Sequence, residues 1–275
     1  MTYGMIKQKG AKTVTRRVAF VSGGGSGLGK ATVRTLLADG WAVAFTYHES
    51  EQSAQAIVDE SNPLGYEVFP IKADLLCRDS AESAAKSAIA HFGQIDAFVH
   101  NFGPFVFERK RLAEYSEDDF EKMLTGNIRV FWWLYRHFVP GMRAGQFGRI
   151  VTFGSDGAGL AMGWSHRAAY AAAKAGLASL TRSVAREERQ FGITANMVCP
   201  GDIRGRNKEL TADERAGNEP VGGDVSRMVA FYCRESSREL NGTVTEVNGG
   251  ADIRLRDEEN SVQGENQNGT KSVDA

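Results

Sequence analysis

Short apolar runs alternate with amphipathic segments along most of the chain, and this alternation is the feature that most restricts the fold. Most of the runs are continuously apolar, as is typical of strands in a parallel sheet that is covered on both faces. Between the runs lie helical patterns, such as Val33, Leu36 and Leu37, which end at Asp39-Gly40. The predicted strands are residues 17–22, 42–47, 67–74, 96–101, 149–155, 194–200 and 243–249.

Strands and helices that alternate seven times indicate βαβ units. The sequence therefore predicts an α/β fold, namely a doubly wound, Rossmann-type, mostly parallel seven-stranded sheet with helices on both faces. We expect a single domain over residues 16–253, because no linker divides it. Residues 1–15 are polar and aperiodic, which suggests a flexible leader. Residues 254–275 offer too little apolar surface to offset the entropy of ordering, so we expect a disordered polar tail.

The composition argues against several classes of protein. The 275 residues include 33 basic and 34 acidic side chains, a balance that does not favour a nucleic-acid or membrane surface. No run approaches the roughly 18 apolar residues of a membrane span. The N-terminus lacks the apolar segment of a secretory signal, although its basic residues leave an organelle transit peptide open.

The three cysteines are Cys77, Cys199 and Cys233. They are widely spaced and form no CxxC or Cys/His cluster, so neither a disulfide framework nor a metal site is predicted. We expect free, buried thiols in a reducing compartment, and hence a cytoplasmic protein.

A glycine-rich turn lies between the first predicted strand and the first helix, with Gly23, Gly27 and Gly29 at its key positions. Glycine reaches positive φ and lets a ligand approach the main chain closely. The free N–H groups of the following helix favour an anion. The turn predicts a dinucleotide pyrophosphate site, with a ligand-free structural turn as the alternative. It is not a P-loop, because no GK[ST] follows at the required spacing.

The end of the second strand bears on the choice of cofactor. Enzymes that use NAD commonly place a carboxylate there to bind the ribose hydroxyl. Here Tyr47 and His48 occupy the expected position, Glu49 comes slightly late, and Lys30 lies on the first helix nearby. The sequence therefore favours NADP, as NADPH, over NAD.

Tyr170 and Lys174 are four positions apart, hence on one face of a predicted helix. Ser155 stands at the end of a predicted strand, where a parallel sheet opens into a ligand crevice. We expect the three side chains to converge beside a bound nicotinamide.

With these residues the chain resembles the short-chain dehydrogenase/reductase family over roughly residues 17–252. The family's glycine motif has Ser22 at its first position here, and its NNAG motif appears as HNFG, with Phe102 in place of alanine. The endings CPGDIR and TEVNGGADI resemble 3-oxoacyl-[acyl-carrier-protein] reductase-like members. The family's catalytic residues match Asn127, Ser155, Tyr170 and Lys174.

The cofactor site follows from the glycine turn, the second strand and the resemblance together. By resemblance, Asp74 would contact adenine, and Ile203 would contact nicotinamide just beyond the Pro200-Gly201 turn. The predicted cofactor-binding residues are Gly23, Ser26, Gly27, Leu28, Gly29, Tyr47, His48, Asp74, Leu75, Asn101, Gly103, Tyr170, Lys174, Pro200, Gly201 and Ile203.

The resemblance implies that hydride moves between nicotinamide and a carbonyl carbon while Tyr170 exchanges a proton with the oxygen. A tyrosine hydroxyl has an ordinary pKa of about 10, and we expect the Lys174 ammonium to lower it. Ser155 would hydrogen-bond the substrate oxygen, and Asn127 would hold a water that connects Lys174 to solvent.

Two features depart from the family's pattern. Fifteen positions separate Ser155 from Tyr170, about two more than is usual, so an offset of the serine is open and Ser165 is a remote substitute. The segment after Pro200-Gly201 is short, which suggests an open cleft or a poorly ordered lid.

The substrate is predicted only in outline. Phe102, Phe105 and Phe107 lie where it would enter, whereas Trp132 and Trp133 are expected in the core or in a subunit interface. The basic residues 109–111 suit either an acidic acyl carrier protein or a solvated face.

The leading hypothesis is an NADPH-dependent reductase that converts a ketone to a secondary alcohol, with a 3-oxoacyl thioester as one candidate. The alternatives are a sugar, steroid or polyol alcohol dehydrogenase, and a catalytically silent dinucleotide-binding protein. A homo-oligomer, either a dimer or a tetramer, is expected by resemblance.

Overall fold

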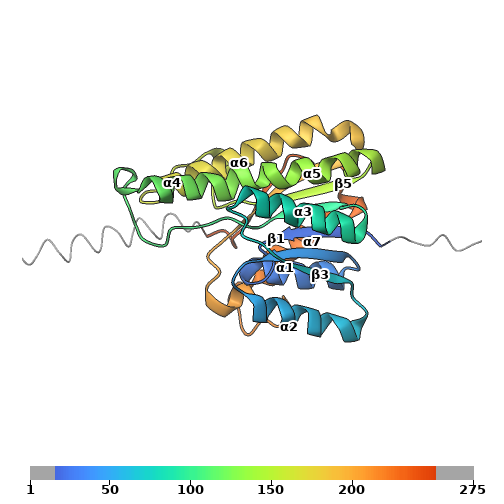
Figure 1. Ribbon diagram of the computed structural model, residues 1–275. Coiled ribbons are helices and arrows are strands. Elements are labelled where there is room, and N and C mark those ends of the chain that lie inside the picture. The colour runs from blue at the N-terminus through green and yellow to red at the C-terminus, as the bar shows by residue number, and fades with distance from the viewer. Residues whose placement is uncertain (1–15, 252–275) are drawn as a thin grey trace, which may run out of the picture.

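A parallel sheet of seven strands forms the centre of the molecule, as the alternation of apolar runs predicts (Figure 1). The computed structural model describes residues 16–251, so the expected leader (1–15) and tail (254–275) lie outside the described range. The strand order is β3-β2-β1-β4-β5-β6-β7, and every neighbouring pair is parallel. The strands are β1 Val18–Ser22, β2 Ala42–Tyr47, β3 Val68–Lys72, β4 Ala97–His100, β5 Gly148–Phe153, β6 Ile193–Pro200 and β7 Val244–Val247.

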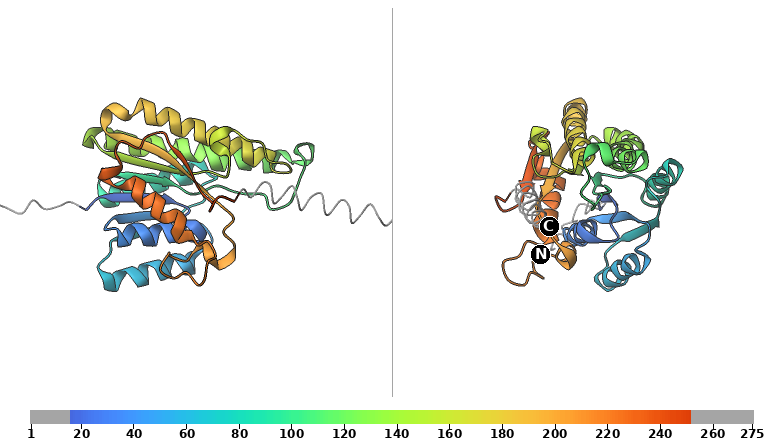
Figure 2. Two further views of the ribbon diagram at one scale, coloured as in Figure 1. Left: turned by 180° about the vertical axis from the view of Figure 1, so that it is seen from behind. Right: turned by 90° about the vertical axis from the view of Figure 1, so that its left-hand side faces the viewer.

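Helices cover both faces of the sheet (Figures 1 and 2). Figure 2 shows α7 running beside α1, and the two helices are in contact. On one face lie α3 Arg78–Phe92, α5 Val130–Gly145 and α6 Ala168–Glu187. On the other lie α1 Gly27–Ala38, α2 Glu51–Ser61 and α7 Gly222–Cys233. The short helix α4 Glu117–Leu124 precedes α5.

Strand β1 shows why its sequence is apolar at nearly every position. Val18 and Phe20 belong to the core under α3, α5 and α6, whereas Ala19 and Val21 belong to the core under α1, α2 and α7. Successive side chains of a strand point to opposite faces. A strand covered on both faces must therefore be apolar throughout.

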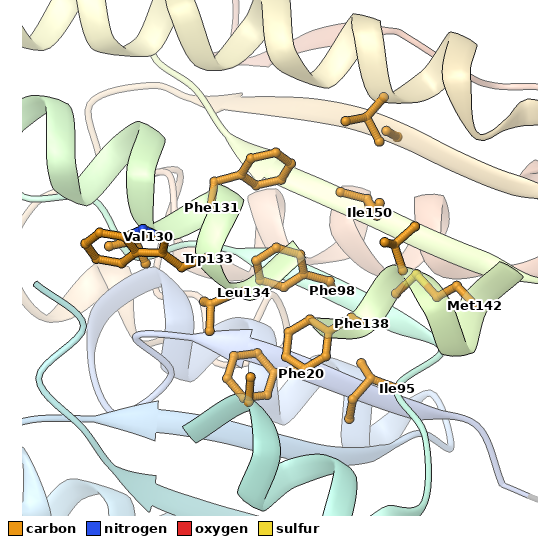
Figure 3. Close-up of a cluster of buried hydrophobic side chains, with 14 of the residues drawn as sticks. Phe20, Ile95, Phe98, Val130, Phe131, Trp133, Leu134, Phe138, Met142 and Ile150 are labelled. Carbon is orange, nitrogen blue, oxygen red and sulfur yellow. The ribbon is translucent and has the colours of Figure 1, made fainter. Parts of the chain in front are cut away.

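Aromatic side chains fill the space between the sheet and α5 (Figure 3). The ring centroid of Phe98 lies 5.2 Å from that of Phe138 and 5.7 Å from that of Phe131. Phe138 in turn lies 4.8 Å from Phe20. Such ring pairs add to the free energy gained by burying apolar area, so the cluster fastens β1 and β4 to α5.

The chain between α4 and α5 makes a π-helical turn over Thr125–Arg129. The N–H of Val130 donates to the carbonyl of Thr125, five residues earlier. Turns of this kind are frequent at functional sites. This one places Asn127 in a fully buried position.

One expectation about burial is partly wrong. Cys199 and Cys233 are buried free thiols, but Cys77 is exposed, because it lies at the surface turn that begins α3. Trp133 packs in the core, and the neighbouring Trp132 is 51% exposed on the outer side of α5, so a subunit interface at Trp132 stays a prediction. Among the helices of residues 16–251, none combines the length and the apolar character needed to span a membrane.

We predict that Phe98→Ala lowers the free energy of unfolding by roughly 3–5 kcal/mol, since it leaves a cavity among three rings. Urea unfolding followed by circular dichroism measures the change. Leu64→Ala is the control, because Leu64 is 65% exposed; it should change the value by less than about 1 kcal/mol. Equal losses in the two variants would contradict the central position of Phe98.

Candidate active site

A cavity of about 810 Å³ opens at the carboxyl ends of the strands. In doubly wound sheets such a crevice forms where the strand order reverses. Here the reversal lies between β1 and β4, which are neighbours in the sheet. The cavity wall includes the glycine turn, residues that follow β2, β4, β5 and β6, and two side chains of α6.

Most of the predicted site residues line this cavity. They are Gly23, Ser26, Leu28, Tyr47, His48, Leu75, Asn101, Gly103, Ser155, Tyr170, Lys174, Pro200, Gly201 and Ile203. Gly27, Gly29, Asp74 and Asn127 lie outside the lining. The carboxylate of Asp74 instead accepts a hydrogen bond from the N–H of Leu76, at 3.0 Å.

The glycine turn depends on residues that have no Cβ. Gly23 and Gly27 have φ values of 67° and 55°, which L side chains rarely adopt. A Cβ on Gly29 would lie 2.6 Å from the amide nitrogen of Asn101. That nitrogen donates to the carbonyls of Ser22 and Gly23, at 3.2 and 2.8 Å. Asn101, at the end of β4, thus supports the turn that follows β1.

Tyr170 and Lys174 project from α6 into the cavity, as their spacing predicts. The Nζ of Lys174 donates to the carbonyl of Phe153 at 2.7 Å and lies 5.5 Å from the ring centroid of Tyr170. Ser155 follows β5 and lines the same cavity. Ser165, the remote substitute, is exposed, bonds His166 and is not part of the lining.

Gly103 brings Asn127 and Lys174 together behind the cavity wall. A Cβ on Gly103 would lie 2.5 Å from Oδ1 of Asn127 and 3.0 Å from Nζ of Lys174, so only glycine leaves room. The Nδ2 of Asn127 donates to the carbonyl of Met123 at 2.9 Å. Its buried Oδ1 has no hydrogen-bond partner within residues 16–251, so it can accept one from a water or an ammonium.

His100 occupies the first position of the altered HNFG motif. Its Nδ1 lies 3.2 Å from the hydroxyl of Ser22, which also accepts from the N–H of Phe102 at 3.1 Å. Burial, aided by the charge of Lys174, lowers the pKa of His100 to about 3. The imidazole is therefore neutral at physiological pH, and it joins the ends of β1 and β4.

Burial also controls the ionisation of the two side chains on α6. It lowers the pKa of Lys174 to about 8 and raises the pKa of Tyr170 above its ordinary value. The net lowering of the Tyr170 pKa that we expected from Lys174 is therefore not present in this arrangement. The ammonium is bonded to the Phe153 carbonyl, and removal of the phenol from water dominates.

A carboxylate lies at the start of α1, where the sequence predicts a pyrophosphate. Glu209 accepts a hydrogen bond from the N–H of Gly27 at 3.2 Å and pairs with Nζ of Lys30 at 3.2 Å. An anion at a helix N-terminus is stabilised by the unpaired N–H groups and by the helix dipole. The position is thus suited to a phosphate, and the donors fit the diphosphate of a dinucleotide.

Several cavity residues escaped the sequence analysis, among them Thr46, Asp156, Trp164, Asp202 and Lys208. Thr46 accepts from the N–H of Gly23 at 2.9 Å. Asp156 could have been noticed as the neighbour of Ser155. Trp164 lies on an irregular segment, and Lys208 ends the short 3-10 helix Gly205–Lys208, so neither periodicity nor a motif gives a signal for them.

Comparison with known proteins decides the family. Residues 17–216 match the family model described as short chain dehydrogenase. The chain belongs to the short-chain dehydrogenase/reductase family. Its members are oxidoreductases that bind a nicotinamide dinucleotide, and the glycine turn and the cavity of this chain have the place expected for that cofactor.

Relatives of this family cover nearly the whole described chain. YtkK of Bacillus subtilis, which is named as an oxidoreductase, is 42% identical over 86% of this chain and 97% of its own length. The hydroxynaphthalene reductase-like protein Arp2 of Metarhizium robertsii is 30% identical over 87% of this chain and 96% of its own. The 3-oxoacyl-[acyl-carrier-protein] reductase FabG of Staphylococcus epidermidis is 29% identical, over 84% and 97%.

Solved structures of the family agree with the fold. A protein from Bacillus thuringiensis, described as a candidate 3-oxoacyl reductase, has a TM-score of 0.84 and 41% identity over 87% of this chain and 99% of its own. A blue fluorescent protein from a metagenomic library, solved with NADPH, has a TM-score of 0.76 and 34% identity, with coverage of 87% and 99%.

We predict that the Lys174 ammonium titrates near pH 8, because burial disfavours its charged form. Nuclear magnetic resonance of carbon-labelled lysine follows the titration, and Lys174→Arg identifies the signal. Lys72, which is exposed and paired with Glu51, has a raised pKa and should titrate well above it in the same spectra. A midpoint for Lys174 at or above that of Lys72 would contradict the burial described here.

Proposed function

We propose that this oxidoreductase uses NADPH to reduce a ketone to a secondary alcohol. The observation that supports this most strongly is that Tyr170 and Ser155 line the same cavity as the glycine turn. A substrate oxygen between the two hydroxyls would stand beside the nicotinamide end of a dinucleotide that begins at the turn. The catalytic and cofactor-binding residues named from the sequence are part of this proposal.

The bound nicotinamide supplies the hydride. Tyr170 donates its proton to the carbonyl oxygen as negative charge develops there, and its raised pKa keeps the phenol protonated at neutral pH. The hydroxyl of Ser155 donates a hydrogen bond to the same oxygen. A hydrogen bond from either hydroxyl stabilises the negative charge on the carbonyl oxygen more in a site that excludes water than at the protein surface.

Lys174 acts on Tyr170 after the proton has left. Its ammonium favours the phenolate by charge attraction over the short distance between the two side chains. The Asn127 Oδ1 beside Gly103 can hold a water next to Nζ, through which Lys174 exchanges protons with solvent. The π-helical turn places the Asn127 Oδ1 where it can accept a hydrogen bond from that water.

NADPH is favoured over NADH by the residues at the end of β2 and directly after it. Tyr47 and His48 line the cavity at the position where a carboxylate would bind the ribose hydroxyl of NAD. Lys30 is nearby and donates to Ser53 at 3.2 Å, beside the start of α2. The related blue fluorescent protein solved with NADPH supports the same choice.

The substrate class has more than one candidate. A 3-oxoacyl thioester is suggested by the names of FabG and the Bacillus thuringiensis protein, and a hydroxynaphthalene by that of Arp2. An acyl carrier protein would meet a partly neutralised surface, since Lys110 lies 3.0 Å from the carboxylates of both Glu108 and Asp119. A sugar, steroid or polyol stays a weaker alternative.

Other parts of the proposal rest on the sequence alone. A homodimer or homotetramer, a cytoplasmic location and the single-domain limits of residues 16–253 stay predictions. A catalytically silent dinucleotide-binding protein is disfavoured, because the buried Lys174 and the π-helical turn would be destabilising features without a use.

We predict that Tyr170→Phe lowers kcat for ketone reduction by about 100- to 10,000-fold, because the proton donor is lost. The dissociation constant for NADPH should change far less than kcat, because the phenylalanine ring keeps the apolar surface of Tyr170. Loss of NADPH absorbance measures turnover, and NADPH fluorescence measures binding. Tyr66→Phe is the control, since Tyr66 is not part of the cavity lining. Full turnover by the Tyr170→Phe protein would overturn the mechanism.

We predict that Glu209→Gln tightens NADPH binding several-fold. The wild-type carboxylate must leave Gly27 and Lys30 before a diphosphate can bind there. A competing contact of about 1 kcal/mol corresponds to roughly fivefold in Kd. Glu219→Gln removes an equal charge from an exposed position of the same segment and should have no effect.

Fluorescence titration of the wild type and both variants gives the three constants. Weaker binding by the Glu209→Gln protein would show that Glu209 belongs to the cofactor site rather than competing with it. In the wild type, NADPH should bind more tightly than NADH. The reverse order would overturn the choice of cofactor.

A further inference from the structure

Three aromatic side chains line the cavity near Tyr170, and we call Phe105, Phe107 and Trp164 the aromatic wall. The Phe105 ring meets Tyr170 edge to face, with centroids 4.8 Å apart and planes at 89°. Trp164 also meets Tyr170 edge to face, at 6.1 Å. Phe107 lies 5.2 Å from Phe105 and is 80% exposed, so it stands at the mouth.

Arg167 holds the wall in place. Its guanidinium donates to the carbonyls of Val106, Phe107 and Glu108, at 2.5 to 2.8 Å. It also lies 4.8 Å from the ring centroid of Phe105. Arg167 is buried, so these bonds are shielded from water. The segment that carries Phe105 and Phe107 is therefore fixed against the start of α6 before any substrate binds.

The aromatic wall has almost no polar group that could stabilise a charge on the substrate. Its only polar atom is the indole N–H of Trp164, which is buried and has no hydrogen-bond partner within residues 16–251. Asp156 and Asp202 add carboxylates to the lining near Ser155 and the Pro200-Gly201 turn. Asp202 pairs with Arg204, Asp156 accepts a hydrogen bond from the side chain of Asn248, and Lys208 also lines the cavity, so these carboxylates do not decide the charge of the substrate. A charged group would lose hydration against the apolar rings of the wall, whereas a neutral ring with one further oxygen could accept a hydrogen bond from the indole N–H.

We propose that the substrate is a neutral ketone on a flat, fused ring system, which lies against the aromatic wall while its carbonyl oxygen meets Tyr170 and Ser155. This inference rests on the proposed function. A flat ring extends the edge-to-face and stacked contacts already present in the wall. It also loses no internal freedom on binding, unlike a linear acyl chain, which would lose conformational entropy when it is ordered.

The test compares β-tetralone, a fused-ring ketone, with methyl octyl ketone, a linear ketone of the same number of carbon atoms. The full-length protein and NADPH are used, and kcat/KM is measured by loss of NADPH absorbance. We expect β-tetralone to be preferred by at least about tenfold over the linear ketone and over acetoacetyl-N-acetylcysteamine. A linear ketone or thioester that is used equally well or better would overturn the inference.

Two variants separate ring recognition from general apolar burial. Phe105→Leu keeps the wall apolar, so it should lower kcat/KM for β-tetralone several-fold, up to about tenfold, and change that for methyl octyl ketone less than about twofold. Trp164→Phe should reduce kcat/KM for a hydroxylated tetralone more than that for β-tetralone. Equal losses with all substrates would contradict recognition by the wall.

Binding gives a readout that does not depend on turnover. β-Tetralone should quench tryptophan fluorescence saturably in the NADPH complex of the Tyr170→Phe protein, and Trp164→Phe should remove most of that signal. Turnover that depends on Tyr170 but favours linear substrates would overturn this inference alone. The absence of Tyr170-dependent turnover with every ketone would overturn the proposed function, and this inference with it.

Discussion

A small set of hydrogen bonds joins the end of β1 to the end of β4, and both halves of the cavity depend on it. The Asn101 side chain holds the carbonyls of Ser22 and Gly23, while Ser22 and His100 meet behind them. Strand order reverses at this point, so the two segments leave the sheet in opposite directions. One becomes the glycine turn, and the other becomes the segment that carries Gly103 and the aromatic wall.

Desolvation, rather than attraction between opposite charges, dominates the electrostatics of the site. The same burial lowers the pKa of Lys174 and raises that of Tyr170, so both groups move toward their neutral forms. A neutral phenol is the form that donates a proton to a ketone. A lysine with a pKa of about 8 stays mostly protonated at neutral pH, yet it can release a proton readily.

Sequence patterns predicted the sheet and most of the cavity because they concern local, periodic features. Apolar runs mark buried strands, a spacing of four puts Tyr170 and Lys174 on one helix face, and glycines mark a turn with positive φ. The failures concern contacts between distant segments. No short sequence pattern shows that the Glu209 carboxylate accepts a hydrogen bond from the N–H of Gly27. No such pattern shows that Cys77 lies at a surface turn. The pKa of Tyr170 depends on how far the side chain is buried, and the spacing of four between Tyr170 and Lys174 does not predict burial.

The connection between Ser155 and Tyr170, which is about two residues longer than is usual in the family, contributes side chains to the cavity. The sequence raised the concern that two added residues displace the serine, but Ser155 lines the cavity with Tyr170. The connection instead supplies Trp164 and Arg167, one as part of the aromatic wall and the other as the group that holds its opposite segment. The longer connection thus contributes to the shape of the cavity beside Tyr170. In such a fold, chemistry can stay constant while the connections after β4 and β5 decide what enters.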